Sequence, residues 1–187
     1  WLKKLTGLRI VVDAGHSEDS GAIGPTGLSE REVNLPIAKK LKNILERNGA
    51  KVTMTRSEME NVFLYDRPKI ALESKADVFI SIHNNAHPDG INPVVYNGTG
   101  VYYYNPQSEL LAEKIHKYLV DSLGIPAHGL NYANFAVLRP AQYLSVLVEC
   151  AFIIVPEQEM LLRSEIFQNK VARSIYRGVV EFLQTVR

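Results

Sequence analysis

The sequence predicts a single α/β domain built on a mostly parallel, twisted sheet of about six strands, with helices on both faces. Two observations support this fold class. Apolar, strand-like runs alternate along the chain with segments whose apolar residues recur at helical spacing. The length of 187 residues, without an internal repeat or a flexible linker, suits one domain with a sizeable core. We therefore treat residues 1–187 as one domain, with its core at about residues 8–184.

The first half of the chain alternates between short apolar runs and amphipathic segments. Strands are predicted at 9–15, 51–55 and 77–83, and helices at 32–48 and 66–75. Asn48-Gly49 closes the first helix. Asp66 is a suitable cap for the second helix, with Arg67-Pro68 in its first turn.

The second half continues the alternation after a long connection. Strands are predicted at 100–104, 135–139 and 145–152, and a helix at 107–123. Pro156 opens a final helical region that is expected to break near Ser164. The segment 84–99 has a loop composition and is long for a connection, which is typical of a functional rim.

Composition excludes several classes of protein and of site. Hydrophobic residues make up 46% of the chain and charged residues 22%, and the formal net charge is +1, so no nucleic-acid partner is expected. No apolar run approaches the roughly 20 residues of a membrane span. The opening segment WLKKLTGLRI lacks the cleavage site of a signal peptide. The single cysteine, Cys150, excludes an internal disulfide and a Cys-rich zinc site.

Polar side chains stand where three predicted strands end. His16 follows the first strand, His83 closes another, and Glu149 sits late in a third. Ligands of open α/β sheets bind beyond the carboxyl ends of the strands, so these groups are expected to meet at one edge. Two histidines and one carboxylate form a common catalytic zinc set, whereas calcium and magnesium prefer oxygen ligands. The sequence therefore predicts a zinc site that includes His16 and His83.

Two glutamates compete for the carboxylate position at the start of the first helix. Ser29 and Glu32 match a capping box, which would give Glu32 a structural role and leave Glu30 free for a metal. Pro36 complicates this interpretation, because it would interrupt a helix that begins at Ser29; Asn34 is then the alternative cap. Both assignments stay open on the residues alone.

The remaining candidates have plainer structural explanations. His87 is a rival ligand, but it lies beyond its strand. His116 falls among lysines on a helix and is expected at the surface, and His128 precedes a glycine in a predicted turn. Asp13 either orients a metal-binding histidine or hydrogen-bonds the strand-end turn. Cys150 follows Glu149 in a strand, so it points to the opposite face and is expected to be a small buried hydrophobe.

The ordered motifs resemble one known family over almost the whole chain. VVDAGHSEDSGAIGPTGLSEREVNLPIAKKLKNILERNGAKVTMTR, ADVFISIHNNAH, TGVYYY, NFAVLR and VLVECAF, in this order and spacing, resemble the zinc-dependent N-acetylmuramoyl-L-alanine amidases of the Amidase_3 type. The resemblance implies one Zn²⁺ held by His16, Glu30 and His83, and it implies Glu149 as the catalytic carboxylate. It thereby favours Glu30 over Glu32.

The resemblance also implies the substrate and the place of action. The family cuts the amide between the lactyl group of N-acetylmuramic acid and L-alanine in bacterial peptidoglycan or its muropeptides. That substrate implies an extracytoplasmic location, in the periplasm, cell wall or medium, and it allows for cell-wall-binding domains outside this chain. Asn85 and Arg139 are the candidates for binding stem-peptide carboxylates. Glu149 would accept a proton from water and deliver it to the leaving nitrogen.

The chain departs from the family pattern around the expected site. Ser17-Glu18-Asp19-Ser20 replaces the glycine pair that often follows the first histidine, and Leu144-Ser145 and the residues after Glu149 also differ. The segment 84–99 is too irregular for the inhibitory helix of some members, which predicts an open site. The rival functions are a catalytically silent peptidoglycan-binding module of the same fold and a zinc peptidase that acts on stem peptides.

Overall fold

A computed structural model describes residues 4–88 and 90–186 of the chain. Residues 1–3 of the opening segment and residue 89 of the predicted 84–99 loop lie outside the described part. The centre of the domain is a six-stranded sheet in the order β2-β1-β3-β6-β4-β5. Its strands are β1 (Arg9–Ala14), β2 (Lys51–Met54), β3 (Val78–Asn85), β4 (Thr99–Tyr103), β5 (Ala127–Tyr132) and β6 (Leu144–Phe152).

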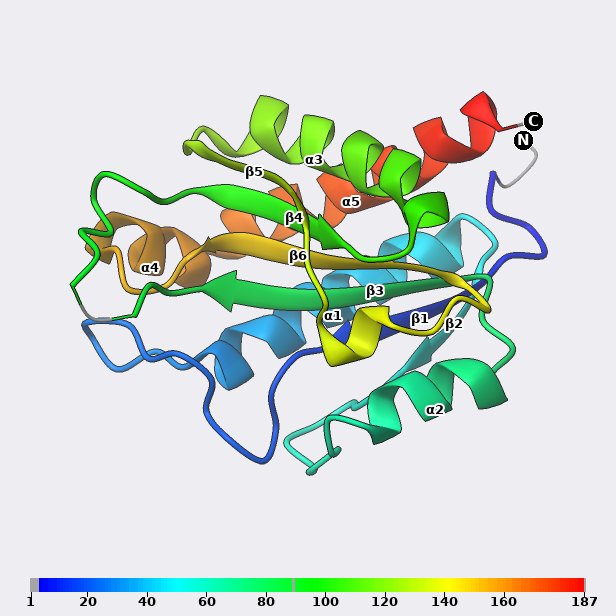
Figure 1. Ribbon diagram of the computed structural model, residues 1–187, viewed down its shortest axis with the longest axis horizontal. Helices are drawn as coiled ribbons and strands as arrows, with labels where there is room; N and C mark the ends of the chain where they lie inside the picture. The colour runs from blue at the N-terminus through cyan, green and yellow to red at the C-terminus, as the bar shows by residue number, and fades with distance from the viewer. Residues whose placement is uncertain (1–3, 89, 187) are drawn as a thin grey trace.

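The sheet is mostly parallel, as predicted. β1 pairs in parallel with β2 and β3, and β3 pairs in parallel with β6. β4 runs antiparallel to β6, and β5 pairs in parallel with β4. The carboxyl ends of β1, β3 and β6 therefore meet at one edge of the sheet, next to the start of the first helix (Figure 1).

Helices cover both faces of the sheet (Figure 1). α1 (Glu30–Arg47), α3 (Glu109–Leu123) and α5 (Glu165–Thr185) bury their apolar faces in the larger core, together with residues of α4 (Pro156–Arg163). α2 (Asp66–Glu73) and the short 3-10 helix η2 (Ala136–Leu138) cover the other face over a smaller core, and η1 (Pro106–Ser108) leads into α3. Cys150 is fully buried in the larger core, as expected.

The first helix begins at Glu30 because the capping box forms. The Ser29 hydroxyl accepts a hydrogen bond from the backbone N–H of Glu32, and the Glu32 carboxylate accepts one from the Ser29 backbone N–H at 3.0 Å. The alternative cap at Asn34 is wrong: Asn34 is buried within the helix and Pro36 is accommodated in its second turn. The exposed Glu32 carboxylate is therefore used by the capping box, whereas the Glu30 side chain is buried and takes no part in it.

Two elements differ from the sequence prediction. The segment 135–139 is not a strand, because residues 136–138 form η2. The strand beside β4 is β5, whose residues 127–132 lack the apolar run or strict alternation expected of a strand; His128 belongs to it instead of a free turn. His116, expected at the surface, is half-buried on α3. None of these differences touches the edge where β1, β3 and β6 end.

Within residues 4–88 and 90–186, no helix is long and apolar enough to cross a membrane. The described residues of the 84–99 segment form the end of β3, an irregular loop and the start of β4, with no helix among them.

Candidate metal and active site

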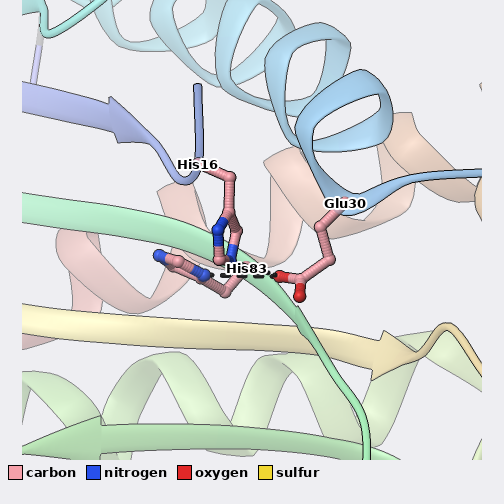
Figure 2. Close-up of side chains that lie close together, drawn as sticks. All are labelled: His16, Glu30 and His83. Carbon is pink, nitrogen blue, oxygen red and sulfur yellow. Dashed lines mark ion pairs between the residues drawn. The ribbon is translucent and has the colours of Figure 1, made fainter. Parts of the chain in front are cut away.

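Three side chains converge at the carboxyl edge of the sheet and can hold a metal ion. His16, Glu30 and His83 each offer one ligand atom, and these atoms all lie within 4.8 Å of one another. Glu30 Oε2 lies 3.3 Å from His16 Nε2 and 3.3 Å from His83 Nδ1 (Figure 2). The fold therefore brings together the same three residues that were expected to bind the metal ion.

Each of the three side chains comes from a different local structure. His83 stands near the end of β3, and Glu30 is the first residue of α1. His16 lies in the loop after β1 with a φ of 58°, the left-handed region that few non-glycine residues adopt. Such backbone conformations persist where the surrounding structure enforces them, and they gather at functional sites.

Glu30 is held by backbone donors on both carboxylate oxygens. Oε1 accepts a hydrogen bond from the Ala22 N–H at 2.8 Å, and Oε2 accepts one from the Asn84 N–H at 3.1 Å. Burial by itself raises the pKa of Glu30, but the contacts with His16 and His83 outweigh it and hold that pKa well below its ordinary value. Glu30 is therefore an ionised carboxylate, the form that binds a metal ion.

Two glycines make room for the histidines. A Cβ on Gly15 would lie 2.3 Å from His83 Nε2, and a Cβ on Gly21 would lie 2.6 Å from His16 Cδ2. Any side chain at either position would displace a ring. The tight packing fixes where the imidazoles can sit.

Glu149 faces the same space from the neighbouring strand. It is paired with His83 across β3 and β6, and both residues line a cavity of about 370 Å³. Its Oε2 is buried and has no hydrogen-bond partner among the described residues. Burial, and then the charge of Glu30, raises the pKa of Glu149 well above its ordinary value. A carboxyl group in this setting is suited to take up and release a proton.

The rest of the cavity is a mixture of apolar walls and polar rims. Of its apolar lining residues, Leu147 is buried, while Leu64 and Phe135 are exposed. The remaining lining residues are His16, Ser17, Glu18, Asp19, Arg67, Ala136 and Val137. Asn85 and Arg139 are not among the lining residues of the described chain, so their predicted substrate contacts stay predictions.

Asn85 and Arg139 have other partners in this structure. Asn85 Oδ1 accepts a hydrogen bond from the Ala86 N–H at 2.8 Å. Arg139 is exposed, and its Nε donates to Asn134 Oδ1 at 2.8 Å. His87, the rival ligand, contacts the ring of Phe152 and places Nε2 2.6 Å from the Tyr96 carbonyl oxygen. His87 does not belong to the metal-ligand group found among the described residues.

Two buried arginines that the sequence did not identify support the loop before His16. Arg67 donates to Asp13 Oδ1 at 2.6 Å, to the Ala14 carbonyl at 2.9 Å and to Ser17 Oγ at 3.0 Å. Arg56 donates to the carbonyl oxygens of Ala14 and Gly15 at 2.9 and 3.2 Å. The Arg67-Pro68 pair was recognised only as a helix start, since nothing local to the sequence reveals a partner 54 residues away.

Asp13 hydrogen-bonds neither a metal-binding histidine nor the backbone of the strand-end turn among the described residues, so its contacts differ from both predicted roles. It is completely buried and accepts hydrogen bonds from Arg67, Thr55 and Ser81, at 2.6 Å in each case. Burial raises the pKa of Asp13, but the Arg67 charge and the two hydroxyl donors outweigh burial and lower it. Asp13 therefore anchors Arg67 beneath the His16 loop.

Comparisons with known proteins find one family over most of the chain. Residues 10–181 match the Amidase_3 family, described as N-acetylmuramoyl-L-alanine amidase. The chain is 38% identical over 183 residues to the N-acetylmuramoyl-L-alanine amidase LytC of Bacillus subtilis, covering 95% of this chain and 36% of LytC. It is 33% identical over 225 residues to the amidase AmiA of Escherichia coli, covering 96% of this chain and 78% of AmiA.

Solved structures show the same fold. The chain superposes on the amidase AmiC2 of Nostoc punctiforme with a TM-score of 0.89 and 37% identity, covering 96% of this chain and 99% of AmiC2. It superposes on the catalytic domain of CwlV from Bacillus (Paenibacillus) polymyxa with a TM-score of 0.87 and 37% identity, covering 95% and 98% of the two chains. The chain spans 36%, 53% and 60% of the length of three curated relatives.

Proposed function

Because the chain belongs to the Amidase_3 family of N-acetylmuramoyl-L-alanine amidases, we propose that it is a zinc-dependent hydrolase of peptidoglycan. The bond cut is the amide between the lactyl group of N-acetylmuramic acid and L-alanine of the stem peptide. One observation carries the proposal: His16, Glu30 and His83 form a metal-ligand group at the cavity that Glu149 also lines. We also propose that the chain acts outside the cytoplasmic membrane, because peptidoglycan lies there.

The donor set fits zinc. Two imidazole nitrogens and one carboxylate oxygen are ligands that zinc takes in catalytic sites, with a position left over for water or substrate. Two ligand atoms about 2.0–2.2 Å from one tetrahedral ion lie about 3.4 Å apart. The observed separations of 3.3 Å from Glu30 Oε2 to His16 Nε2 and to His83 Nδ1 match that spacing. When bound, zinc supplies a Lewis acid that activates water and polarises the scissile carbonyl.

The side chains of the cavity account for the rest of the reaction. Glu149 accepts a proton from the attacking water on its unpartnered Oε2 and then delivers that proton to the leaving nitrogen of L-alanine. Leu147 and Val137 provide an apolar wall that limits water around the carboxylate. Leu64 and Phe135 are the exposed apolar residues of the cavity lining, where the sugar and the stem peptide of the substrate would enter and leave.

Digestion of purified muropeptides by the protein, with identification of the products, tests the proposal. An amidase releases the intact stem peptide, with a free L-alanine amino group, from the intact sugar, and mass spectrometry identifies both products. Activity is expected to disappear with a zinc chelator and to return when zinc is added back. Cleavage within the peptide would show a zinc peptidase instead, and binding to cell walls without any cleavage would show a silent binding module. Either result would refute the proposed activity.

A further inference from the structure

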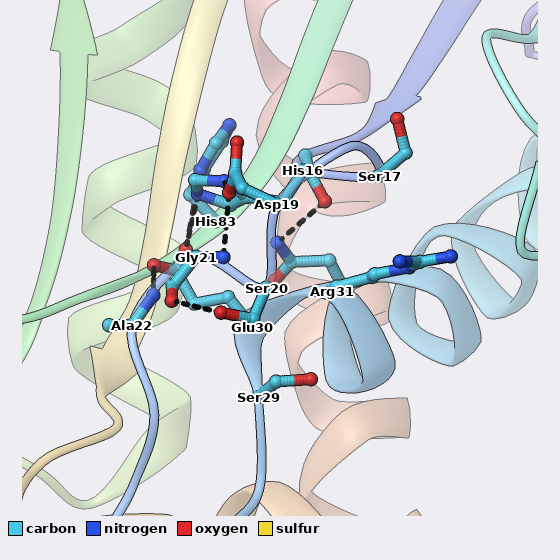
Figure 3. Close-up of polar contacts among 12 residues, drawn as sticks. His16, Ser17, Asp19, Ser20, Gly21, Ala22, Ser29, Glu30, Arg31 and His83 are labelled. Carbon is cyan, nitrogen blue, oxygen red and sulfur yellow. Dashed lines mark hydrogen bonds and ion pairs between the residues drawn. The ribbon is translucent and has the colours of Figure 1, made fainter. Parts of the chain in front are cut away.

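The loop that carries His16 contains a carboxylate aimed at that histidine. Asp19 Oδ1 lies 2.5 Å from His16 Nδ1, and it also accepts a hydrogen bond from the Gly21 N–H at 2.7 Å (Figure 3). Asp19 belongs to the polar stretch Ser17–Ser20 that follows His16.

The two nitrogens of His16 face different partners. Nε2 is 3.3 Å from Glu30 Oε2 and belongs to the metal-ligand side of the ring, whereas Nδ1 meets Asp19. An imidazole binds a metal ion through a nitrogen that carries no proton, so the proton of the neutral ring must be on the other nitrogen. A carboxylate that accepts the Nδ1–H bond keeps the proton there and leaves Nε2 free, and it also raises the basicity of the ring.

Asp19 also connects His16 to the segment that holds Glu30. Its second hydrogen bond fixes Gly21, and the next residue, Ala22, donates its N–H to Glu30 Oε1 at 2.8 Å. Backbone bonds from Glu30 N–H to the Ala22 carbonyl at 2.9 Å, and from Arg31 N–H to the Ser20 carbonyl at 3.0 Å, attach this loop to the start of α1. One carboxylate thus influences the spacing of two of the three ligands.

The other histidine is positioned in a different way. His83 is part of β3, and its ring packs against Gly15, where a Cβ would come within 2.3 Å. His16 has no strand beneath it and adopts a left-handed φ of 58°. The ligand on the loop is therefore the one that needs a separate side chain to hold its ring.

We propose that Asp19 is a positioning residue that holds His16 with its proton on Nδ1, and that it thereby sets the affinity of the site for zinc. The inference rests on the proposed function, because it takes zinc as the metal. Asp19 itself does not contact the metal-facing nitrogen. Its role is distinct from that of a simple turn residue, which would support the loop without affecting the ring.

Zinc affinity measured by competition with a chromophoric chelator tests the first part. Asp19→Ala is expected to raise the Kd for zinc about 10- to 100-fold. Asp19→Asn keeps an oxygen that can accept the Nδ1–H bond and should recover much of the loss. Glu58→Gln removes a carboxylate that is 79% exposed, pairs with Lys39 and does not line the cavity, and should leave the Kd close to that of the wild type. An unchanged Kd in Asp19→Ala, or no recovery in Asp19→Asn, would overturn the proposal.

The tautomer of His16 separates positioning from loop stability. Long-range ¹H–¹⁵N NMR of the metal-free protein, recorded at a pH where the His16 ring is neutral, should show the ring proton on Nδ1, toward Asp19, in the wild type and a loss of that preference in Asp19→Ala. Weaker zinc binding with an unaltered His16 tautomer would reveal a turn residue only, and would contradict the inference. A wild-type chain that binds no zinc would overturn both this inference and the proposed function. Zinc binding that follows the expected order without muropeptide cleavage would remove the proposed function alone.

Discussion

Glu149 lies directly opposite His83 in the parallel register of β6 and β3. Side chains alternate between the two faces of a strand, so a slip of one residue in β6 would move Glu149 into the larger core and bring Cys150 to the cavity. The core fixes the register, because Val148 and Cys150 are fully buried on the opposite face. Ordinary packing of apolar residues thereby places a carboxylate beside His83, one of the three residues that could hold a metal ion.

Glu149→Gln should abolish most of the hydrolysis while leaving the metal site intact. The amide has nearly the shape of the carboxylate but cannot take up the proton of water, and general-base catalysis contributes about 10²- to 10⁴-fold. We expect kcat on muropeptides to fall by at least about 10²-fold, with zinc content unchanged by metal analysis. Near-normal turnover would exclude Glu149 as the base.

Gly15→Ala should weaken zinc binding by displacing His83. The new Cβ would lie 2.3 Å from His83 Nε2, too close for any contact, so the ring has to move out of the ligand group. Equilibrium dialysis with metal analysis should show a zinc Kd raised by about tenfold or more, the scale seen when a ligand is poorly oriented.

Gly178→Ala is the matched control for Gly15→Ala. Its Cβ would lie 2.5 Å from Ile115 Cα, between α5 and α3, so it is expected to lower the free energy of unfolding and leave zinc affinity unchanged. Two results would show that the space beside His83 does not position the ring. One is a zinc affinity of Gly15→Ala equal to that of the wild type, and the other is an equal loss of zinc affinity in Gly178→Ala.

Much of the site follows from local patterns in the sequence. Buried apolar runs mark β1, β3 and β6, and polar residues at their carboxyl ends have to meet at one edge of a parallel sheet. The capping box of Ser29 and Glu32 depends on neighbours within a few residues, and the structure confirms it. The choice of Glu30 over Glu32 for the metal site stayed open on the residues alone and came from the family resemblance; Glu30 lies with His16 and His83 in a group that could hold a metal ion.

Other features depend on distant partners and could not be predicted. The segment 135–139 has a short apolar run, and such a run does not distinguish a strand from a helical turn; η2 forms there and supplies Val137 to the cavity wall. β5 lacks a strand pattern because it lies at the edge of the sheet and is only partly buried. The contacts of Arg67 and Arg56 with the His16 loop join segments more than 40 residues apart.

Phe135→Ala should weaken substrate binding more than catalysis. Phe135 lines the cavity, is 39% exposed and packs against Tyr102, with 5.3 Å between ring centroids. Loss of one aromatic contact worth about 1.4 kcal/mol would raise KM about tenfold and leave kcat nearly unchanged. Tyr65→Ala is the control, since Tyr65 is 64% exposed and is not among the residues that line the cavity. Equal effects of the two variants on KM would argue against a substrate contact at Phe135.

Asp13→Asn should destabilise the fold and change how its stability depends on pH. The Asp13–Arg67 pair is buried and 2.6 Å long, and removing one partner of a buried pair costs about 3–5 kcal/mol. The pKa of Asp13 is lower in the folded state than in the unfolded chain. Its contribution is therefore fully present above the unfolded pKa of about 3.9 and is lost as the pH falls below that value.

Denaturant unfolding between about pH 7 and pH 3 measures both effects of Asp13→Asn. The wild type should lose more of its free energy of unfolding over this range than the variant does, because the variant lacks the group that becomes protonated. Asp77→Asn is the control: its pair with Arg9 is 2.7 Å long but 42% and 35% exposed at the two side chains. An exposed ion pair of this kind contributes about 0–1 kcal/mol to the free energy of unfolding, so the stability of Asp77→Asn should stay close to that of the wild type. If Asp13→Asn were no more destabilising than Asp77→Asn, the buried pair would not be what holds Arg67 under the His16 loop.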